Sequence, residues 1–210
     1  DAGQGEWGSF LETDLERELD IIRLNVMSLV SLTKLYVRDM AARNEGKILQ
    51  LGSEAGTTPV PLLSIYAATK AFVLSFSIAL ANELKDTGIT VTVLLPGATD
   101  TDFFHKAGQE DTVTYREKKL ASPEEVARDG YDALMKGESK IISGARTKNH
   151  VFMSDLLGQK LSAVNMKKQM LPSEKSGRTG STHAASKKER QAINQQTGGK
   201  DGDYPDEEIL

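Results

Sequence analysis

The stretch Lys47-Ile48-Leu49-Gln50-Leu51-Gly52-Ser53 is a short apolar run that ends at a glycine and a serine. A second run, Ile89-Thr90-Val91-Thr92-Val93-Leu94-Leu95, is rich in β-branched residues and stops at Pro96-Gly97. Runs of this length, bounded by glycine or proline, are typical of strands buried in a parallel sheet. The two runs therefore predict two such strands, with Ser53 and Pro96-Gly97 at their carboxyl ends.

Helical patterns alternate with these strands. Apolar residues recur at helical spacing from residue 13 or 14 to residue 42, and residues 66–85 are rich in Ala, Leu and Phe. Ser122-Pro123-Glu124-Glu125 is a helix start, because it combines an N-cap serine, a proline in the first helical position and a capping glutamate. A third short strand is expected at 140–144. This order predicts an α/β fold of Rossmann type, with three layers around a parallel sheet.

The domain organisation follows from a change in composition. Residues 1–166 read as one partial Rossmann-type domain, in which 98–120 is irregular with a short helix and 151–166 is one amphipathic helix at best. Residues 167–210 are expected to form a disordered tail, because Ser, Thr, Gly, Gln, Lys and acidic residues dominate its greater part.

Composition excludes several classes of function. The 210-residue chain has a formal net charge of −4, which suggests no nucleic-acid partner. Its longest apolar runs, 71–81 and 89–95, fall short of the roughly 20 residues that span a bilayer, so no membrane span is expected. There is no cysteine and the three histidines are scattered, so no metal site is predicted. We expect a cytoplasmic protein, and a chain that begins inside a longer one, because it opens on Asp1 without a leader.

The segment Ser64-Ile65-Tyr66-Ala67-Ala68-Thr69-Lys70 carries the chemistry. On a helix, the i,i+4 spacing sets the phenol of Tyr66 and the ammonium of Lys70 on one face, where the cation favours the phenolate. Such a tyrosine can give or take a proton. The segment Tyr115-Arg116-Glu117-Lys118-Lys119 has the same spacing, so the spacing alone decides nothing.

The surroundings of Tyr66 distinguish the two segments. Asn25 lies 28 residues before Ser53, Ser53 lies 13 residues before Tyr66, and Lys70 follows Tyr66 by 4. With Pro96-Gly97-Ala98-Thr99-Asp100-Thr101 after the next strand, this set resembles the short-chain dehydrogenase/reductase (SDR) family over roughly residues 1–145. Tyr115 has no strand-end serine at the matching interval.

The resemblance implies an oxidoreductase that transfers a hydride between a nicotinamide cofactor and a carbonyl or alcohol. Tyr66 would be the general acid/base and Ser53 would donate a hydrogen bond to the carbonyl oxygen. Lys70 would lower the Tyr66 pKa and bind the nicotinamide ribose, and Asn25 would hold a relay water. Two plainer interpretations stay open: Asn25 as an asparagine at a helix bend, and Ser53 as a turn serine.

The resemblance also implies the cofactor contacts. They are Tyr66 and Lys70 together with Ala2, Gly3, Pro96, Gly97, Thr99 and Thr101. Asp1 departs from the family's Asn-Asn-Ala-Gly motif. The cofactor would be NADP or NAD, and the preference is not readable because the family's Gly-rich turn lies upstream of that motif.

The remaining expectations concern the substrate pocket, the oligomeric state and an alternative function. Phe103, Phe104, Val113, Tyr115, Val60, Leu62 and Leu63 suggest an apolar pocket wall or plain core. The two long helices resemble those of the family's dimer interface, which implies a homodimer or homotetramer when the protein is intact. The edge of the 47–53 strand would lie open and apolar, so the isolated chain is predicted to bind dinucleotide poorly and to associate. The rival function is an inactive fragment or a cofactor-binding or protein-interaction module of the same fold.

Overall fold

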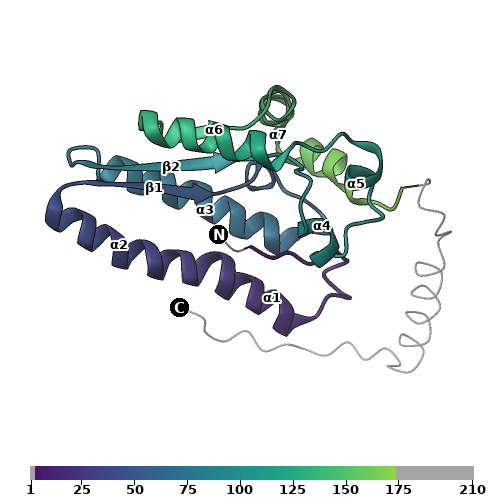
Figure 1. The fold of residues 1–210 in the computed structure, drawn as a ribbon. Helices are drawn as coiled ribbons and strands as arrows, with labels where there is room; N and C mark the ends of the chain where they lie inside the picture. The colour runs from purple at the N-terminus through teal and green to yellow at the C-terminus, as the bar shows by residue number, and fades with distance from the viewer. Residues whose placement is uncertain (1–2, 174–210) are drawn as a thin grey trace. The chain divides into compact units, whose positions relative to one another are not determined.

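A parallel sheet organises the fold. The computed structural model describes residues 3–173, and in these the sheet has the order β1-β2-β3, with both strand pairs parallel (Figure 1). The bounds are Gly46–Leu51 for β1, Ile89–Leu95 for β2 and Lys140–Ile142 for β3. Gly46 pairs with Ile89, and Leu94 with both Leu51 and Ile141. The three predicted strands are confirmed.

Helices cover both faces of this sheet. On one face lie α1 (Leu15–Ile22), the π-helix η1 (Arg23–Ser28), α2 (Leu29–Arg43) and α3 (Ser64–Glu83). On the opposite face lies α6 (Pro123–Lys136), whose N-cap Ser122 accepts a hydrogen bond from Glu125 N. Figure 1 shows α2 and α3 below the sheet and α6 above it. The three-layer Rossmann-type prediction is therefore confirmed.

Short elements complete the chain. They are the 3₁₀-helix η2 (Glu54–Gly56), α4 (Phe103–Lys106) and α5 (Val113–Glu117). The last helix of the described residues, α7 (Ala145–Met170), is kinked at Gly158, where φ is +73°. It begins before residue 151 and continues past residue 166, so the helix is longer than the predicted one. Of the predicted tail, residues 174–210 lie outside the described residues.

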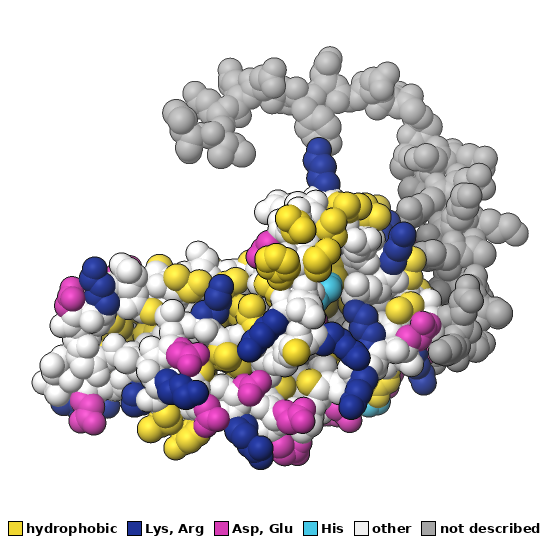
Figure 2. All heavy atoms as spheres, turned by 90° about the horizontal axis from the view of Figure 1, so that it is seen from above, with side chains coloured by type: hydrophobic (Ala, Val, Ile, Leu, Met, Phe, Trp, Pro, Cys, Tyr) yellow, Lys and Arg dark blue, Asp and Glu magenta, His cyan; other side chains and the backbone are white. Residues whose placement is uncertain are grey.

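The apolar side chains of α7 point in two directions. Met166 and Met170 are buried, whereas Phe152 is 67% exposed and Leu156 is 71% exposed. Figure 2, which views the molecule from the side of α6 and α7, shows hydrophobic side chains gathered on part of this face. Both ends of α7 contribute to the interior, since Val151 near its beginning is also buried.

The centre of the core is the contact between α3 and β2. Val73 and Val93 are 0% exposed and Leu95 is 1% exposed. Burying a side chain of this size contributes about 2 kcal/mol relative to an exposed position. The strand is buried on both faces, which explains why its sequence is almost continuously apolar.

Two surfaces bear on the expectations about partners. Among the described residues β1 is an edge strand and Leu49 is 39% exposed, as expected for an open, apolar edge. Contrary to expectation, α3 is long and apolar enough to span a membrane by length and composition, with 28% of the relevant window buried. The helix packs on β2 through Val73, and the core helix of a globular fold meets the same criteria.

Candidate active site

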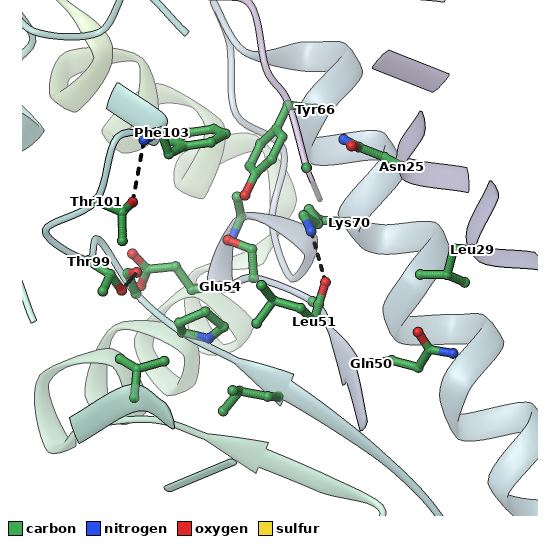
Figure 3. A pocket seen from close by; sticks show the side chains of 18 of the residues that line it. Asn25, Leu29, Gln50, Leu51, Glu54, Tyr66, Lys70, Thr99, Thr101 and Phe103 are labelled. Carbon is green, nitrogen blue, oxygen red and sulfur yellow. Dashed lines mark hydrogen bonds between the residues drawn. The ribbon is translucent and has the colours of Figure 1, made fainter. Parts of the chain in front are cut away.

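Helix α3 places Tyr66 and Lys70 one turn apart on the same face. Lys70 Nζ lies 5.7 Å from the centroid of the Tyr66 ring and donates a hydrogen bond of 2.8 Å to Leu51 O, at the end of β1 (Figure 3). The second Tyr-x-x-x-Lys segment has no such geometry, because α5 ends at Glu117, before Lys119. The Tyr115 ring packs against Phe104, with 5.1 Å between centroids.

Burial sets the ionisation of this pair. Loss of solvation raises the pKa of Tyr66 to about 12; a hydrogen bond with the Ser53 side chain acts in the opposite direction, and the negative charge of Glu54 raises it further. Burial lowers the pKa of Lys70 to about 8. Desolvation is the main cause of the raised Tyr66 pKa, and Lys70 donates its ammonium to Leu51 O, so the expected lowering of the Tyr66 pKa by Lys70 stays a prediction.

Ser53 lies just beyond the carboxyl end of β1, where the chain turns into η2. Its backbone is extended, its Oγ accepts a 3.1 Å hydrogen bond from Ala55 N, and it is 9% exposed. The hydroxyl thus caps η2, as the turn interpretation requires. It also faces Tyr66, which the catalytic interpretation requires.

Gly56 lets this turn lie directly on α3. A Cβ there would stand 2.6 Å from the backbone carbon and oxygen of Lys70. Any side chain would therefore push η2 away from the helix that carries Tyr66. The sequence alone does not reveal this close approach, because it joins segments that are separate in the sequence.

Asn25 lies in the π-helix η1 and is 3% exposed. Its Nδ2 donates to Gln4 O at 2.9 Å and to Thr69 Oγ1 at 3.0 Å, and its Oδ1 accepts from Gln4 N at 3.1 Å. The side chain therefore ties the beginning of the chain to α3. A π-helical turn often marks a functional position. The relay role stays a prediction.

The residues expected to hold the cofactor meet around one cavity. Gly3, Pro96, Gly97, Thr99 and Thr101 all line it, whereas Ala2 lies outside the described residues. A Cβ on Gly3 would stand 3.6 Å from Lys70 Nζ, so the missing side chain leaves space beside the ammonium. Thr99 Oγ1 donates to Gly97 O at 2.9 Å.

The cavity has a volume of about 1300 Å³ and extends from the edge of β1, past Tyr66 and Lys70, to an apolar region. We call this region the chamber; its walls are Val60, Leu63, Phe104, Met166 and Met170. Phe103 also lines the cavity and contacts two rings, with its centroid 4.8 Å from that of Tyr66 and 6.0 Å from that of Phe104. Leu62, Val113 and Tyr115 do not line the cavity, so the predicted apolar wall is right only in part.

Several lining residues were missed by sequence reasoning. Met166 and Met170 come from α7 with an i,i+4 spacing that could have marked one helix face. Glu54 also lines the cavity, and its Oε2 lies 3.2 Å from His150 Nδ1. Nothing in the sequence joins these last two residues. The described residues contain no group of three His, Asp or Glu side chains that could hold a metal ion.

A partly buried tyrosine and a buried lysine on one helix, near a strand-end serine and a cavity at the carboxyl ends of a parallel sheet, are the arrangement expected of a Rossmann-type oxidoreductase site. A family model described as short chain dehydrogenase matches residues 1–112. The chain belongs to the short-chain dehydrogenase family.

Known proteins similar to this chain include two curated enzymes. The chain is 44% identical over 87 residues to 17-beta-hydroxysteroid dehydrogenase type 3 of Mus musculus, and 45% identical over 89 residues to very-long-chain 3-oxoacyl-CoA reductase of Rattus norvegicus. Each match covers 41% of this chain and 28% of the relative, so the chain spans less than a third of either.

A solved structure described as the closed form of serine dehydrogenase complexed with NADP+ is 28% identical, with a TM-score of 0.60. The match covers 67% of this chain and 60% of the chain in that solved structure.

Proposed function

We propose that the protein interconverts a carbonyl compound and an alcohol with a nicotinamide cofactor, with Tyr66 as general acid/base. The observation that carries this proposal is the convergence on one cavity of Ser53, from the end of β1, with Tyr66 and Lys70, from α3. The names of the relatives support an oxidoreductase of hydrophobic carbonyl or alcohol compounds.

The residues that line the cavity are suited to bind a dinucleotide. Gly3 leaves space beside Lys70, and the loop after β2 presents backbone and hydroxyl groups from Gly97, Thr99 and Thr101 to the same cavity. We propose NADP as the cofactor, since the similar solved structure contains NADP+. When bound, the cofactor supplies or accepts the hydride.

Tyr66 and Ser53 handle the substrate oxygen. With a pKa of about 12, Tyr66 is a neutral phenol at physiological pH and can donate its proton to a carbonyl oxygen that gains negative charge. Ser53 donates a second hydrogen bond to that oxygen and so stabilises the developing charge. The apolar chamber receives the rest of the substrate.

Lys70 supports these steps from one turn away. With a pKa of about 8, the side chain carries a proton at neutral pH, and its charge favours the Tyr66 phenolate that is left after proton transfer. The hydrogen bond to Leu51 O holds the ammonium at this position. Asn25 fixes the adjacent turn of α3 through Thr69 and, as proposed, holds a relay water.

We further propose that the intact protein associates through α2 and α3. Both helices expose large apolar side chains outside the cavity, namely Leu35 of α2 and Phe72 and Ile78 of α3. A second copy that covers this surface would bury apolar area that a monomer leaves in water. Sedimentation of wild-type protein and of Phe72→Glu tests this: the variant should shift toward the monomer.

The test of the catalytic proposal is turnover by the full-length protein. NADPH oxidation is followed with a panel of ketones and aldehydes, and NADP+ reduction with the matching alcohols. Turnover of at least one hydrophobic member is expected. Tight cofactor binding without turnover of any member would contradict the proposal and favour the binding-module alternative.

A further inference from the structure

Helix α7 exposes a row of large apolar side chains on the side that faces away from the fold. They are Phe152, Met153, Leu156, Leu157, Leu161 and Val164. Their exposed fractions range from 38% for Leu157 to 71% for Leu156. We call these six residues the outer face of α7. Exposed apolar side chains that gather in this way often mark a binding surface.

The opposite side of α7 is fixed to the rest of the fold. Val151 near its beginning and Met170 at its end are buried. Trp7 Nε1 donates to Met170 O at 2.8 Å, and Ser162 Oγ donates to Ser154 O at 2.9 Å across the kink. Because these contacts hold α7 in its orientation, the outer face cannot turn inward without breaking them.

Basic residues accompany the outer face. Helix α7 contains the exposed residues Arg146, Lys148, Lys160, Lys167 and Lys168. Against them stands one acidic residue, Asp155, so the helix has a formal charge of +4, whereas the whole chain has −4. On the same side of the sheet, α6 carries four acidic residues and two basic ones. A negatively charged partner is therefore expected at α7 and not at α6.

This composition favours one kind of partner. A second copy docked through the same face would bring together two segments of charge +4, which repel. Protein interfaces favour aromatic residues and arginine over lysine. The outer face has one aromatic ring, and four of the five basic residues of α7 are lysines. Residues 174–210 have few large apolar side chains to cover it, namely Ile193, Tyr204, Ile209 and Leu210.

We propose that the outer face of α7, together with its lysines, binds the surface of a membrane that contains anionic lipids. The apolar side chains enter the boundary between headgroups and acyl chains, and the lysines extend to the lipid phosphates and carboxylates. Lysine suits this position, because its apolar stem can lie along the lipid while its ammonium stays in water. The helix lies in the interface and does not cross the bilayer. Met166 and Met170 place one wall of the chamber on this same helix.

The test measures the depth of one residue of α7 in the full-length protein. Leu156→Trp adds an indole to the outer face, and the vesicles contain equal amounts of phosphatidylserine and phosphatidylcholine with brominated acyl chains. Bromine quenches tryptophan at short range, so an indole that enters the acyl-chain boundary loses emission. Wild-type protein is the blank, because the chain has its own Trp7. The added emission of Leu156→Trp should be quenched.

The matched control is Leu15→Trp. Leu15 of α1 is 64% exposed, but this helix carries three acidic residues and one basic residue. Figure 1 shows α1 and α7 on opposite sides of the sheet. The indole of the control should therefore keep its emission. Equal quenching of the two variants would overturn the inference.

Charge reversal tests the part played by the lysines. Lys160→Glu combined with Lys168→Glu should weaken binding to the same vesicles by about thirtyfold or more. Lys34→Glu combined with Arg38→Glu changes the net charge equally, but both residues lie on α2, so binding should stay at the wild-type level. Equal effects of the two pairs, or equally tight binding of wild-type protein to vesicles of phosphatidylcholine alone, would overturn the inference.

Sedimentation without vesicles tests the alternative of a second copy. Leu156→Asp should sediment like wild-type protein and keep its thermal midpoint, because the position is exposed. A shift of this variant toward the monomer would show that a second copy covers the outer face, and would overturn the inference.

The inference does not depend on the proposed function. Vesicle binding needs neither cofactor nor turnover, so it can be found in a protein that reduces no ketone. Conversely, Leu156→Asp should lose vesicle binding and still turn over a water-soluble ketone at the wild-type rate, because Leu156 does not line the cavity of Tyr66.

Discussion

Lys70 Nζ lies 5.7 Å from the centroid of the Tyr66 ring, yet its hydrogen bond goes to Leu51 O. The two side chains therefore share a helix face without direct pairing. Burial favours the neutral form of each side chain: it raises the pKa of Tyr66 to about 12 and lowers the pKa of Lys70 to about 8. These values predict the pH dependence of the reaction.

The first prediction concerns activity. The proposed reduction needs a neutral Tyr66 and a charged Lys70, and both are present below about pH 8. Because kcat/KM reports the groups of the free enzyme, it should be level below that pH and fall above it. A profile that stays level to pH 10 would show that the charge of Lys70 is not required.

The second prediction concerns stability. Lys70 has a pKa of about 8 in the fold and 10.5 as the reference value, so between these pH values the unfolded chain binds more protons and stability rises with pH. Below pH 8 the full penalty of a buried charge is present. Lys70→Met should therefore raise the free energy of unfolding at pH 7 by up to about 3 kcal/mol and abolish activity.

Urea unfolding at pH 7 and at pH 10 measures this effect. The advantage of Lys70→Met should shrink at the higher pH, where the wild-type lysine loses its proton. A variant that is less stable than wild type at pH 7 would mean that the hydrogen bond to Leu51 outweighs desolvation.

The third prediction concerns Gly56. Gly56→Ala would place a Cβ 2.6 Å from the backbone of Lys70, so it should lower the free energy of unfolding by about 3 kcal/mol. Gly108→Ala is the control, because its site has open space and only the positive φ opposes the change, at about 1 kcal/mol. Equal losses for the two variants in chemical denaturation would contradict the close contact.

The fourth prediction concerns Asn25. Asn25→Ala removes the hydrogen bonds to Gln4 and Thr69 and should cost about 2 kcal/mol of stability. Asn25→Asp keeps an acceptor for Gln4 N but loses the donor to Gln4 O and Thr69, so it should be no more stable than the alanine variant. Thermal unfolding compares the two variants with the wild-type protein. If either variant were as stable as wild type, Asn25 would not tie the beginning of the chain to α3.

Local patterns explain how much of the fold the sequence could predict. The cap at Ser122 and the strand Ile89–Leu95 agree with the structure because they depend on neighbouring residues. The placement of Tyr66 and Lys70 on one face of α3 follows from helix periodicity. The same criterion excludes Tyr115 as the catalytic tyrosine, because α5 ends at Glu117, before Lys119.

Long-range contacts explain the rest. The contact of Glu54 with His150 and the entry of Met170 into the chamber depend on where α7 returns to the fold. The burial of Gln109 and the raised pKa of Tyr66 depend on the surrounding walls, which no single segment encodes. The chemistry of the site was therefore more predictable than its energetics.

The most direct measurement of the central claim is the rate of carbonyl reduction by Tyr66→Phe in the full-length protein, with Tyr115→Phe as the matched control. The change at Tyr66 removes only the hydroxyl, so kcat should fall by about 10²–10⁴-fold, the usual contribution of a general acid. The control should keep the wild-type rate. A Tyr66→Phe variant that retains the wild-type rate would contradict the account.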